Sequence, residues 1–565
     1  MIPSIYITYD MVFDDEPLPL FEYLKEFNRD FLIQFALRLI YCGNDIKNFD
    51  SYKKLFFSSS NKEFVNHIDD KLYQKYVLDS NCIIPHSYSI LSESTGLELL
   101  RQIFAVEEFR NILSNTILEQ YLFKVLLIIN KNISGWVIPE ERDKYGQFTS
   151  LYYAKSIFCS FFNGYESLNL EPEFLFLMQV VKGYNFFEYC ENSKLQPILF
   201  KFLEYYGKES WQSYFCDVIR LILYPLKRKN CNYPIITLND NMDGFDFLHS
   251  NSFNINDIIP IDKNKDYTFF KSYPLIELDK KRFIPVNSIF CINNLYKSIY
   301  FRFKQINDSL VGSDLYIKGL RPLLTTEFSE NYLFHKYISN VLCKQRGIKL
   351  SDKNCCKISK KNRRPDFYYR DGNNIFLFES KDIKIPDYVI SEKRWVDFEN
   401  VLNTKLISDA GVSQLVYNIS RIDQKIFPWD DNIPNNPRIY PIMVIEDSSI
   451  CVHGLNFILN DAFQKQLTEK NIKTMVHPLV VIELDTLIAF AEDFRKGKIK
   501  LKNIIDNYYS YLKRNRNNIR PSEILYETYH KYFSFYTYLS DSILYKRFDN
   551  TDFYNICNAL KTNLT

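Results

Sequence analysis

The sequence is 565 residues long, enough for about two to four domains. Hydrophobic residues make up 46% of it and aromatic residues 16%, which is ample for packed cores. The 70 Lys and Arg residues nearly balance 68 Asp and Glu, so the net charge of +2 indicates no class of partner by itself. Apolar runs such as residues 121–129 fall far short of the ~18 residues of a membrane span, which excludes a membrane partner from the prediction.

The 12 cysteines and 7 histidines favour a reducing compartment and no zinc. No Cys-x-x-Cys spacing occurs, and most cysteines lie in apolar stretches, as reduced core residues do. The histidines are scattered and form no ligand cluster. Residues 1–10 lack the basic region and the apolar core of a signal peptide, so we expect a cytoplasmic protein.

Residues 1–235 are predicted to form a mainly helical N-terminal domain. Apolar side chains recur there at the three- and four-residue spacing of a helix face, in residues 20–39, 99–130 and 197–226. No residues of this region have catalytic spacing, and its aromatic stripes are interpreted as core. A role in sensing, or in binding substrate or a partner, is expected.

Residues 236–319 are predicted to be a linker and a small β/α lead-in module. The first part, to about residue 266, is rich in Asn, Asp and Ile without clear periodicity. Strand-like runs follow over residues 267–286 and a helix-like run over residues 288–303. From residue 320 the pattern changes, and a helix is expected from Thr325 to about Cys343.

A first strand is predicted around residues 347–350, and a basic run follows it. The run holds five cations in eight residues, namely Lys357, Lys360, Lys361, Arg363 and Arg364. A charge run is usually a solvated loop, but one that directly precedes a phosphodiester site is suited to contact backbone phosphates.

A β-hairpin is predicted between Asp366 and Lys381. Two strand-like runs, residues 366–370 and 375–381, flank an Asp-Gly-Asn-Asn turn at 371–374. Asp-Gly between two β-rich runs is a strong hairpin signal. Because side chains alternate between faces along a strand, the last acid and the lysine of the second strand project together, and Asp366 reaches the same place.

The chemistry of these residues is that of a metal-dependent phosphodiesterase. Asp366 and Glu379 are the expected metal ligands, with the carbonyl of Ser380 as a third, because Mg²⁺ is held by one or two carboxylates and keeps open positions for water and phosphate. The metal lowers the pKa of bound water and offsets charge on the phosphorus. Lys381 is expected to position the attacking water, to help deprotonate it, or to contact the developing oxyanion.

These residues carry a family resemblance. Pro365-Asp366, followed after thirteen positions by Glu379-Ser380-Lys381, resembles the signature of the PD-(D/E)xK nuclease superfamily, which includes many restriction endonucleases and DNA-repair nucleases. The resemblance covers about residues 320–450. It implies an α/β, restriction-endonuclease-like domain, with a mixed sheet flanked by helices, that cleaves nucleic acid with Mg²⁺ or with Mn²⁺ in its place.

The resemblance also suggests two further site residues on flanking helices. Many family members carry a glutamine on the helix after the Glu-x-Lys strand, and Gln414 matches it, in a helix with Ser413 near its N-cap. The family often places a glutamate on the first helix. We prefer Glu330 for it; Glu327 lies one turn away, and in another register His335 takes the position.

Beyond Gln414, residues 439–446 and 477–484 have the pattern of buried strands and extend the sheet, so that the nuclease domain is expected at 320–490. Residues 491–565 are predicted as a basic, mostly helical C-terminal segment. Its cations Lys498, Lys500 and Lys502 are candidates for a second phosphate-contact surface. A soluble helix pair is the equally weighted alternative.

The sequence therefore predicts a multi-domain α+β protein with a Mg²⁺-dependent nuclease domain. DNA is preferred over RNA because most of the superfamily cuts DNA, and the extra domain suggests bacterial anti-phage defence or restriction by analogy. One alternative is a non-catalytic nucleic-acid-binding or assembly subunit of a defence complex that keeps the fold. Another is an RNA-directed nuclease. A protein partner or a homo-oligomer is compatible with either.

Overall fold

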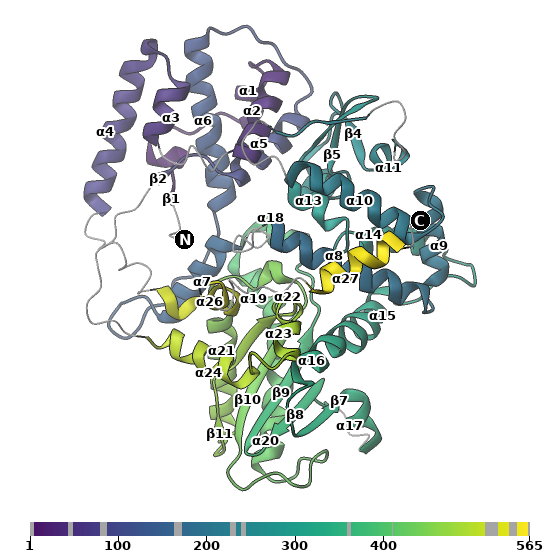
Figure 1. Ribbon diagram of the computed structural model, residues 1–565. Helices are drawn as coiled ribbons and strands as arrows, with labels where there is room; N and C mark the ends of the chain where they lie inside the picture. The colour runs from purple at the N-terminus through teal and green to yellow at the C-terminus, as the bar shows by residue number, and fades with distance from the viewer. Residues whose placement is uncertain are drawn as a thin grey trace. The chain divides into compact units, whose positions relative to one another are not determined.

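The computed structural model describes residues 5–42, 49–79, 88–162, 172–226, 233–238, 245–358, 363–408, 411–514, 529–541 and 551–562. It is a mixed α/β structure in which helices predominate (Figure 1). The chain divides into two compact units, Met1–Gly135 with Leu203–Ile299 and Trp136–Phe202 with Tyr300–Thr565. These divisions differ from the predicted boundaries after residues 235, 319 and 490.

The first unit combines helices with two small sheets. Its helices are α1 (Leu20–Leu24), α2 (Arg29–Cys42), α3 (Phe49–Phe56), α4 (Lys62–Asp79), α5 (Glu93–Ala105), α6 (Asn115–Ser134), α10 (Trp211–Leu226), α11 (Phe245–Ser250), α12 (Thr268–Ser272) and α13 (Ser288–Asn293). A parallel pair joins β1 (Ile5–Tyr6) to β2 (Tyr88–Ser89). A four-stranded sheet has the order β3-β6-β5-β4, with β3 Ile236–Thr237, β4 Ser252–Asn254, β5 Leu275–Asp279 and β6 Arg282–Pro285.

Two predictions for this unit need correction. The apolar stripe over residues 20–39 belongs to two helices, α1 and α2, and its Phe31 is half exposed. Residues 236–266, expected as a linker, supply the edge strands β3 and β4 to the four-stranded sheet. Short strands with few residues have no periodicity that a sequence pattern can reveal.

The second unit is built on a six-stranded mixed sheet. Its strands are β7 (Ile348–Ser351), β8 (Phe367–Asp371), β9 (Asn374–Lys381), β10 (Arg438–Ile445), β11 (Met475–Val476) and β12 (Val480–Glu483). The order is β11-β10-β9-β8-β7, and β12 also pairs with β10. The pairs β7–β8 and β8–β9 are antiparallel, and every pair that includes β10 is parallel. All strands expected in residues 347–484 are confirmed.

Helices precede, separate and follow the strands of this unit in sequence. They are α7 (Ser150–Phe161), α8 (Pro172–Glu191), α14 (Ile299–Ser309), α15 (Leu320–Leu323), α16 (His335–Leu342), α17 (Asp352–Ile358), α18 (Asp387–Glu392), α19 (Trp395–Leu402), α20 (Val412–Asp423), α21 (Leu455–Glu469), α22 (Leu484–Ala489), α23 (Ala491–Arg495), α24 (Leu501–Leu512), α26 (Phe535–Asp541) and α27 (Thr551–Thr562). Helix α9 (Gln196–Tyr205) joins the two units in sequence. Among the described residues no helix is both long and apolar enough to cross a membrane.

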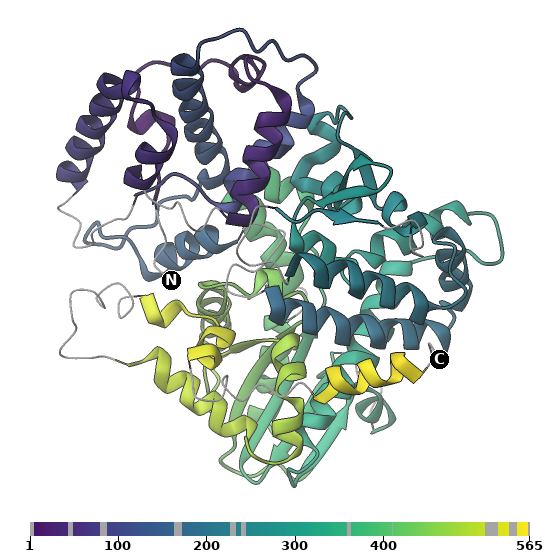
Figure 2. The same cartoon turned by 45° about the horizontal axis from the view of Figure 1, so that its top comes forward.

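The sheet has a separate apolar layer on each face. On one face Tyr368 and Leu377 are fully buried in a cluster with side chains of α20 and α21, among them Ile419. On the other face the ring of Phe378 lies 6.4 Å from that of Phe334. Figure 2 shows the strands between the flanking helices. Burial on both faces makes the strands rigid supports for side chains at their ends.

One helical segment of this unit is unusual. Residues Leu324–Phe334 form a π-helix, η4, between α15 and α16. At its end the backbone N–H of His335 donates to the carbonyl of Glu330, five residues earlier. The predicted helix from Thr325 to Cys343 is therefore continuous but locally wider than an α-helix. Such π-helical turns are rare and often accompany functional sites.

Candidate active site

The β8–β9 hairpin brings the predicted site residues together. Phe367 pairs with Phe378, so the preceding residue Asp366 lies opposite Glu379 on the same face. At the other end Asp371 pairs with Asn374 across a two-residue turn, where Gly372 adopts a φ of +56° that glycine tolerates without strain. The hairpin and its turn are as the sequence predicts.

A lysine lies between the two carboxylates. Lys381 Nζ is 2.6 Å from Glu379 Oε1 and 3.9 Å from Asp366 Oδ2. The backbone N–H of Ser380 donates to Asp366 Oδ2 at 2.6 Å. Both carboxylates therefore converge on one cation at the open end of the hairpin, as expected for Asp366, Glu379 and Lys381.

The two carboxylates are buried with too few hydrogen bonds and cations to offset the cost of ionising them. Burial, reinforced by the charge of Asp366, raises the pKa of Glu379 well above its ordinary value. Burial also raises the pKa of Asp366, against the opposing effects of Lys381 and of the Ser380 N–H. Glu379 is fully buried, and its Oε2 has no hydrogen-bond partner among the described residues. An additional cation at this place would offset the cost of ionising both groups.

The residues fit a hard cation as a two-carboxylate site. Carboxylate oxygens are what Mg²⁺ and Mn²⁺ prefer, and the partnerless Oε2 of Glu379 offers a free acceptor. Within the described ranges no group of three or more His, Cys, Asp or Glu side chains is arranged to hold a metal ion. Water, phosphate and the Ser380 carbonyl would have to supply the remaining ligands, and the role of that carbonyl remains a prediction.

Two of the three first-helix candidates, Glu330 and His335, interact with Asp366. Burial, followed by the charge of Asp366, raises the pKa of Glu330 to about 8. His335, one π-helical turn later, has Nε2 3.2 Å from the backbone carbonyl oxygen of Asp366, and burial lowers its pKa. Glu327 is exposed. Glu330 and His335 thus both face the hairpin, because residues five apart lie closer to one face in a π-helix than in an α-helix, where ~140° separates them.

Gln414 contacts the backbone of the segment that precedes Asp366. Its Nε2 donates to the backbone carbonyl of Arg364 at 2.7 Å, two residues before Asp366. It therefore holds the strand that leads into the site. Ser413 lies near the N-cap of α20 as predicted, two residues after the N-cap residue Gly411, and its hydroxyl donates to the Ile407 carbonyl.

The predicted basic run before Asp366 is only partly available to a phosphate. Arg364 Nε lies 2.6 Å from Asp352 Oδ1, so its charge is paired within the protein. The guanidinium of Arg363 lies over the Tyr417 ring at 5.6 Å. Lys357 is exposed at the end of α17. Lys360 and Lys361 lie outside the described residues.

The predicted second phosphate surface is largely neutralised. Lys498 Nζ is 2.9 Å from Asp493 Oδ1, and Lys502 Nζ is 2.5 Å from Asp506 Oδ2. Lys500 is exposed just before α24. Two of the three lysines are thus paired within the protein, which weakens the phosphate-surface prediction relative to its equally weighted alternative, a soluble helix pair.

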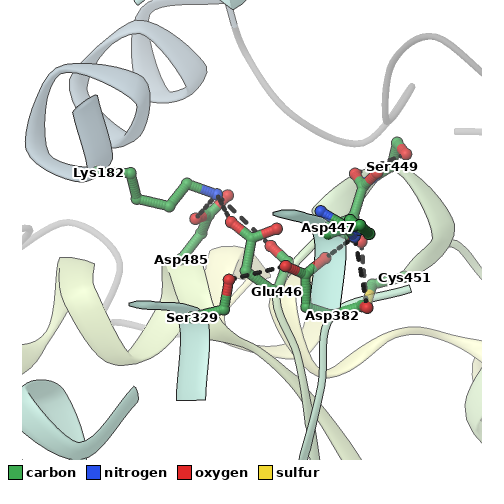
Figure 3. Close-up of polar contacts among 9 residues, drawn as sticks. Lys182, Ser329, Asp382, Glu446, Asp447, Ser449, Cys451 and Asp485 are labelled. Atoms are coloured by element: carbon green, nitrogen blue, oxygen red, sulfur yellow. Dashed lines mark hydrogen bonds and ion pairs between the residues drawn. The ribbon is translucent and has the colours of Figure 1, made fainter. Parts of the chain in front are cut away.

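A second group of charges at the strand ends was not predicted (Figure 3). Lys182 of α8 is buried and lies 2.8 Å from Asp485 Oδ1 and 3.2 Å from Glu446 Oε1. Burial raises the pKa of Glu446 to about 7. Glu446 ends the strand predicted over residues 439–446, but a lone lysine in an apolar helix 264 residues earlier gave no sign of pairing with it.

The chain was compared with protein-family models, with curated proteins and with solved structures, and none of the three gives a significant match.

Proposed function

We propose that the protein hydrolyses phosphodiester bonds of nucleic acid with Mg²⁺ or Mn²⁺, most simply as a DNA endonuclease. The observation that carries the proposal is the convergence of Asp366, Glu379 and Lys381 at the open end of a rigid hairpin. Two buried carboxylates with raised pKa values, bridged by one lysine, have no evident structural use and suit a metal-assisted hydrolase.

Each residue has a role that its position supports. Asp366 and Glu379 would hold the cation, which when bound lowers the pKa of a water molecule and stabilises charge on phosphorus. Lys381 is fixed by both carboxylates, which outweigh the effect of its burial and keep its pKa above the ordinary value. It stays charged at neutral pH, suited to orient water or a phosphate oxygen rather than to take a proton.

The arrangement of the sheet supports the finer fold. An antiparallel hairpin continued by parallel strands, with helices on both faces, is what the resemblance to the PD-(D/E)xK superfamily implies. DNA as substrate, a role in anti-phage defence and a cytoplasmic location extend this proposal by analogy.

A second candidate is a non-catalytic nucleic-acid-binding or assembly subunit. Two observations favour it: Lys381 occupies the space between the carboxylates, and three of the predicted phosphate contacts are paired within the protein. The persistence of two uncompensated buried carboxylates argues against it, because a site freed from catalysis has no reason to keep them.

The test is a cleavage assay with the purified full chain on plasmid, linear duplex, single-stranded DNA and RNA, with Mg²⁺, Mn²⁺ or EDTA. Cutting that requires metal and disappears in Asp366→Ala and Lys381→Ala is the expected result, and the lane that is cut identifies the polymer. Binding without cutting in every lane would favour the second candidate. Cutting that survives both substitutions would exclude this site.

A further inference from the structure

Asp382, the residue after Lys381, carries the inference. Because side chains alternate along a strand, it points away from the Glu379 side of the sheet. Ser329 Oγ donates to Asp382 Oδ2 at 2.7 Å, and Arg321 Nη2 donates to Oδ1 at 2.5 Å (Figure 3 shows the serine contact). Both carboxylate oxygens are thus used, and the Asp382 side chain is only 8% exposed.

Both partners of Asp382 come from the segment that carries Glu330. Arg321 lies in α15, and Ser329 lies in the π-helix η4 directly before Glu330. The Ser329–Asp382 hydrogen bond therefore joins the neighbour of Glu330 to the neighbour of Lys381. Glu330 and Lys381 interact electrostatically across the same gap.

The hydrogen bonds to Asp382 are of a kind that fixes the positions of the groups they join. A charged carboxylate that accepts from a guanidinium and a hydroxyl makes short, directional hydrogen bonds, roughly twice as strong as neutral ones. A π-helix has weaker backbone support than an α-helix, so an external anchor at Ser329 limits how far the segment can shift.

We propose that Asp382 is a positioning residue that holds the Glu330 segment against the Lys381 strand, and so sets the separation of the groups on the two sides of the metal site. This role rests on the proposed function. Asp382 does not itself touch the reacting atoms. A shift of about 1 Å at a reacting centre can cost roughly a hundredfold in rate, which makes such an anchor consequential.

The same sheet offers a matched control. Asp430 accepts from Arg370 Nε at 2.5 Å and from the Tyr368 hydroxyl at 2.7 Å, and its side chain is 1% exposed. Like Asp382, Asp430 accepts from one guanidinium and one hydroxyl, and it also accepts from the backbone N–H of Asn432. Arg370 lies near the turn, at the opposite end of the hairpin from Lys381.

The experiment compares Asp382→Asn with Asp430→Asn, and the milder Ser329→Ala with Tyr368→Phe, in the full chain. Two quantities are measured: the Mn²⁺ dependence of the cleavage rate, and the rise in Tm that Mn²⁺ causes. We expect comparable losses of metal-free Tm in each matched pair. Only Asp382→Asn and Ser329→Ala should need more Mn²⁺ and cut about ten- to a hundredfold more slowly at low Mn²⁺. Ser329→Thr, which keeps the hydroxyl, should restore the rate.

The outcomes separate the two proposals. If the wild-type protein responds to Mn²⁺ and each Asp382-side variant behaves like its Asp430-side control, the positioning role is wrong while the proposed function stands. If Ser329→Thr cuts no better than Ser329→Ala, the hydroxyl is not the anchor and the role is also wrong. If the wild-type protein neither cuts nor changes its Tm with Mn²⁺, the proposed function fails and the positioning role fails with it.

Discussion

Two buried carboxylates, one beside each end of the β8–β9 hairpin, have pKa values shifted in opposite directions. At the turn end, burial alone would raise the pKa of Asp430, but Arg370, Tyr368 and a backbone N–H hold it below the ordinary value. At the open end, burial prevails and the pKa of Glu379 is raised well above it. Glu379 lies in β9, Asp430 lies in the loop between α20 and β10 and contacts β8, and each has a cation beside it.

The difference lies in how many donors each carboxylate has. Asp430 accepts from a guanidinium, a hydroxyl and the N–H of Asn432, whereas Glu379 accepts from Lys381 and leaves Oε2 without a partner among the described residues. A buried carboxylate with few hydrogen-bond donors lowers the stability of the folded state, and a bound cation would offset that loss. A protein retains such a cost where function needs it.

The largest expected effect is on cleavage. Lys381→Met should lower the rate by at least ~100-fold, because it removes a preorganised charge beside the reacting phosphate. Arg370→Met, at the turn end, should leave the rate per folded molecule unchanged. Single-turnover cleavage with Mn²⁺, normalised to the folded fraction by circular dichroism, measures both. Equal losses in the two variants would show that the open end has no special role.

Metal should stabilise the open end alone. An ion whose free concentration is one hundred times its Kd adds about 2.7 kcal/mol to the free energy of unfolding when it binds only the folded protein. Mn²⁺ should therefore raise the wild-type Tm. Glu379→Gln should abolish that rise, and Asp430→Asn should preserve it. The measurement is differential scanning fluorimetry across a Mn²⁺ titration. A full Tm rise in Glu379→Gln would remove this carboxylate from the metal site.

Stability should change with pH in opposite directions at the two ends. A carboxyl whose pKa is raised in the folded state lowers the free energy of unfolding as pH rises above the unfolded pKa, which is near 4.5 for Glu379. Above that pH the metal-free Glu379→Gln variant should therefore be more stable than the wild-type protein. Asp430, with a lowered pKa, contributes stability above its unfolded value near 3.8 and loses it as pH falls through the folded pKa. Asp430→Asn should therefore cost about 2 kcal/mol at neutral pH.

Urea unfolding of both variants from pH 4 to 8 measures these differences. Wild-type-like stability of Asp430→Asn at pH 7, or a Glu379→Gln variant that is no more stable there than the wild-type protein, would contradict the contrast between the two ends.

The smallest effect concerns the lysines of the C-terminal segment. If exposed Lys500 contacts a phosphate, Lys500→Ala should lower the salt slope of nucleic-acid binding by about one. Lys498→Ala should change it less, because Asp493 already neutralises that lysine. Fluorescence anisotropy between low and moderate salt resolves the two. Identical slopes for all three proteins would remove this surface from the interface.

The site residues on the hairpin could be predicted from the sequence because the patterns that indicate them are local. The Asp-Gly turn, the alternation along residues 375–381 and the spacing of Asp366, Glu379 and Lys381 all follow from strand geometry. The sheet strands near residues 348, 440 and 480 were likewise found from apolar runs. Each of these patterns lies within a dozen or so residues.

The rest depends on contacts that no local pattern encodes. Lys182 pairs with Asp485, and Ser329 with Asp382, across long stretches of chain. Lys498 pairs with Asp493 across the turn that follows α23, a contact that the run of lysines alone does not indicate. The helix periodicity before Cys343 gave the segment correctly but not its π-helical width, which decides that Glu330 and His335 share one face.

That width determines how the segment would respond to a change in its length. In an α-helix, residues five apart are rotated by ~140° from each other, whereas in η4 Glu330 and His335 both face the hairpin. Deleting one residue between them would place them four apart, a spacing at which an ordinary α-helix also keeps two side chains on one face. Inserting one residue would place them six apart and rotate one of them away from the carboxylates. The extra residue of η4 thus makes a single-codon deletion less disruptive here than a single-codon insertion.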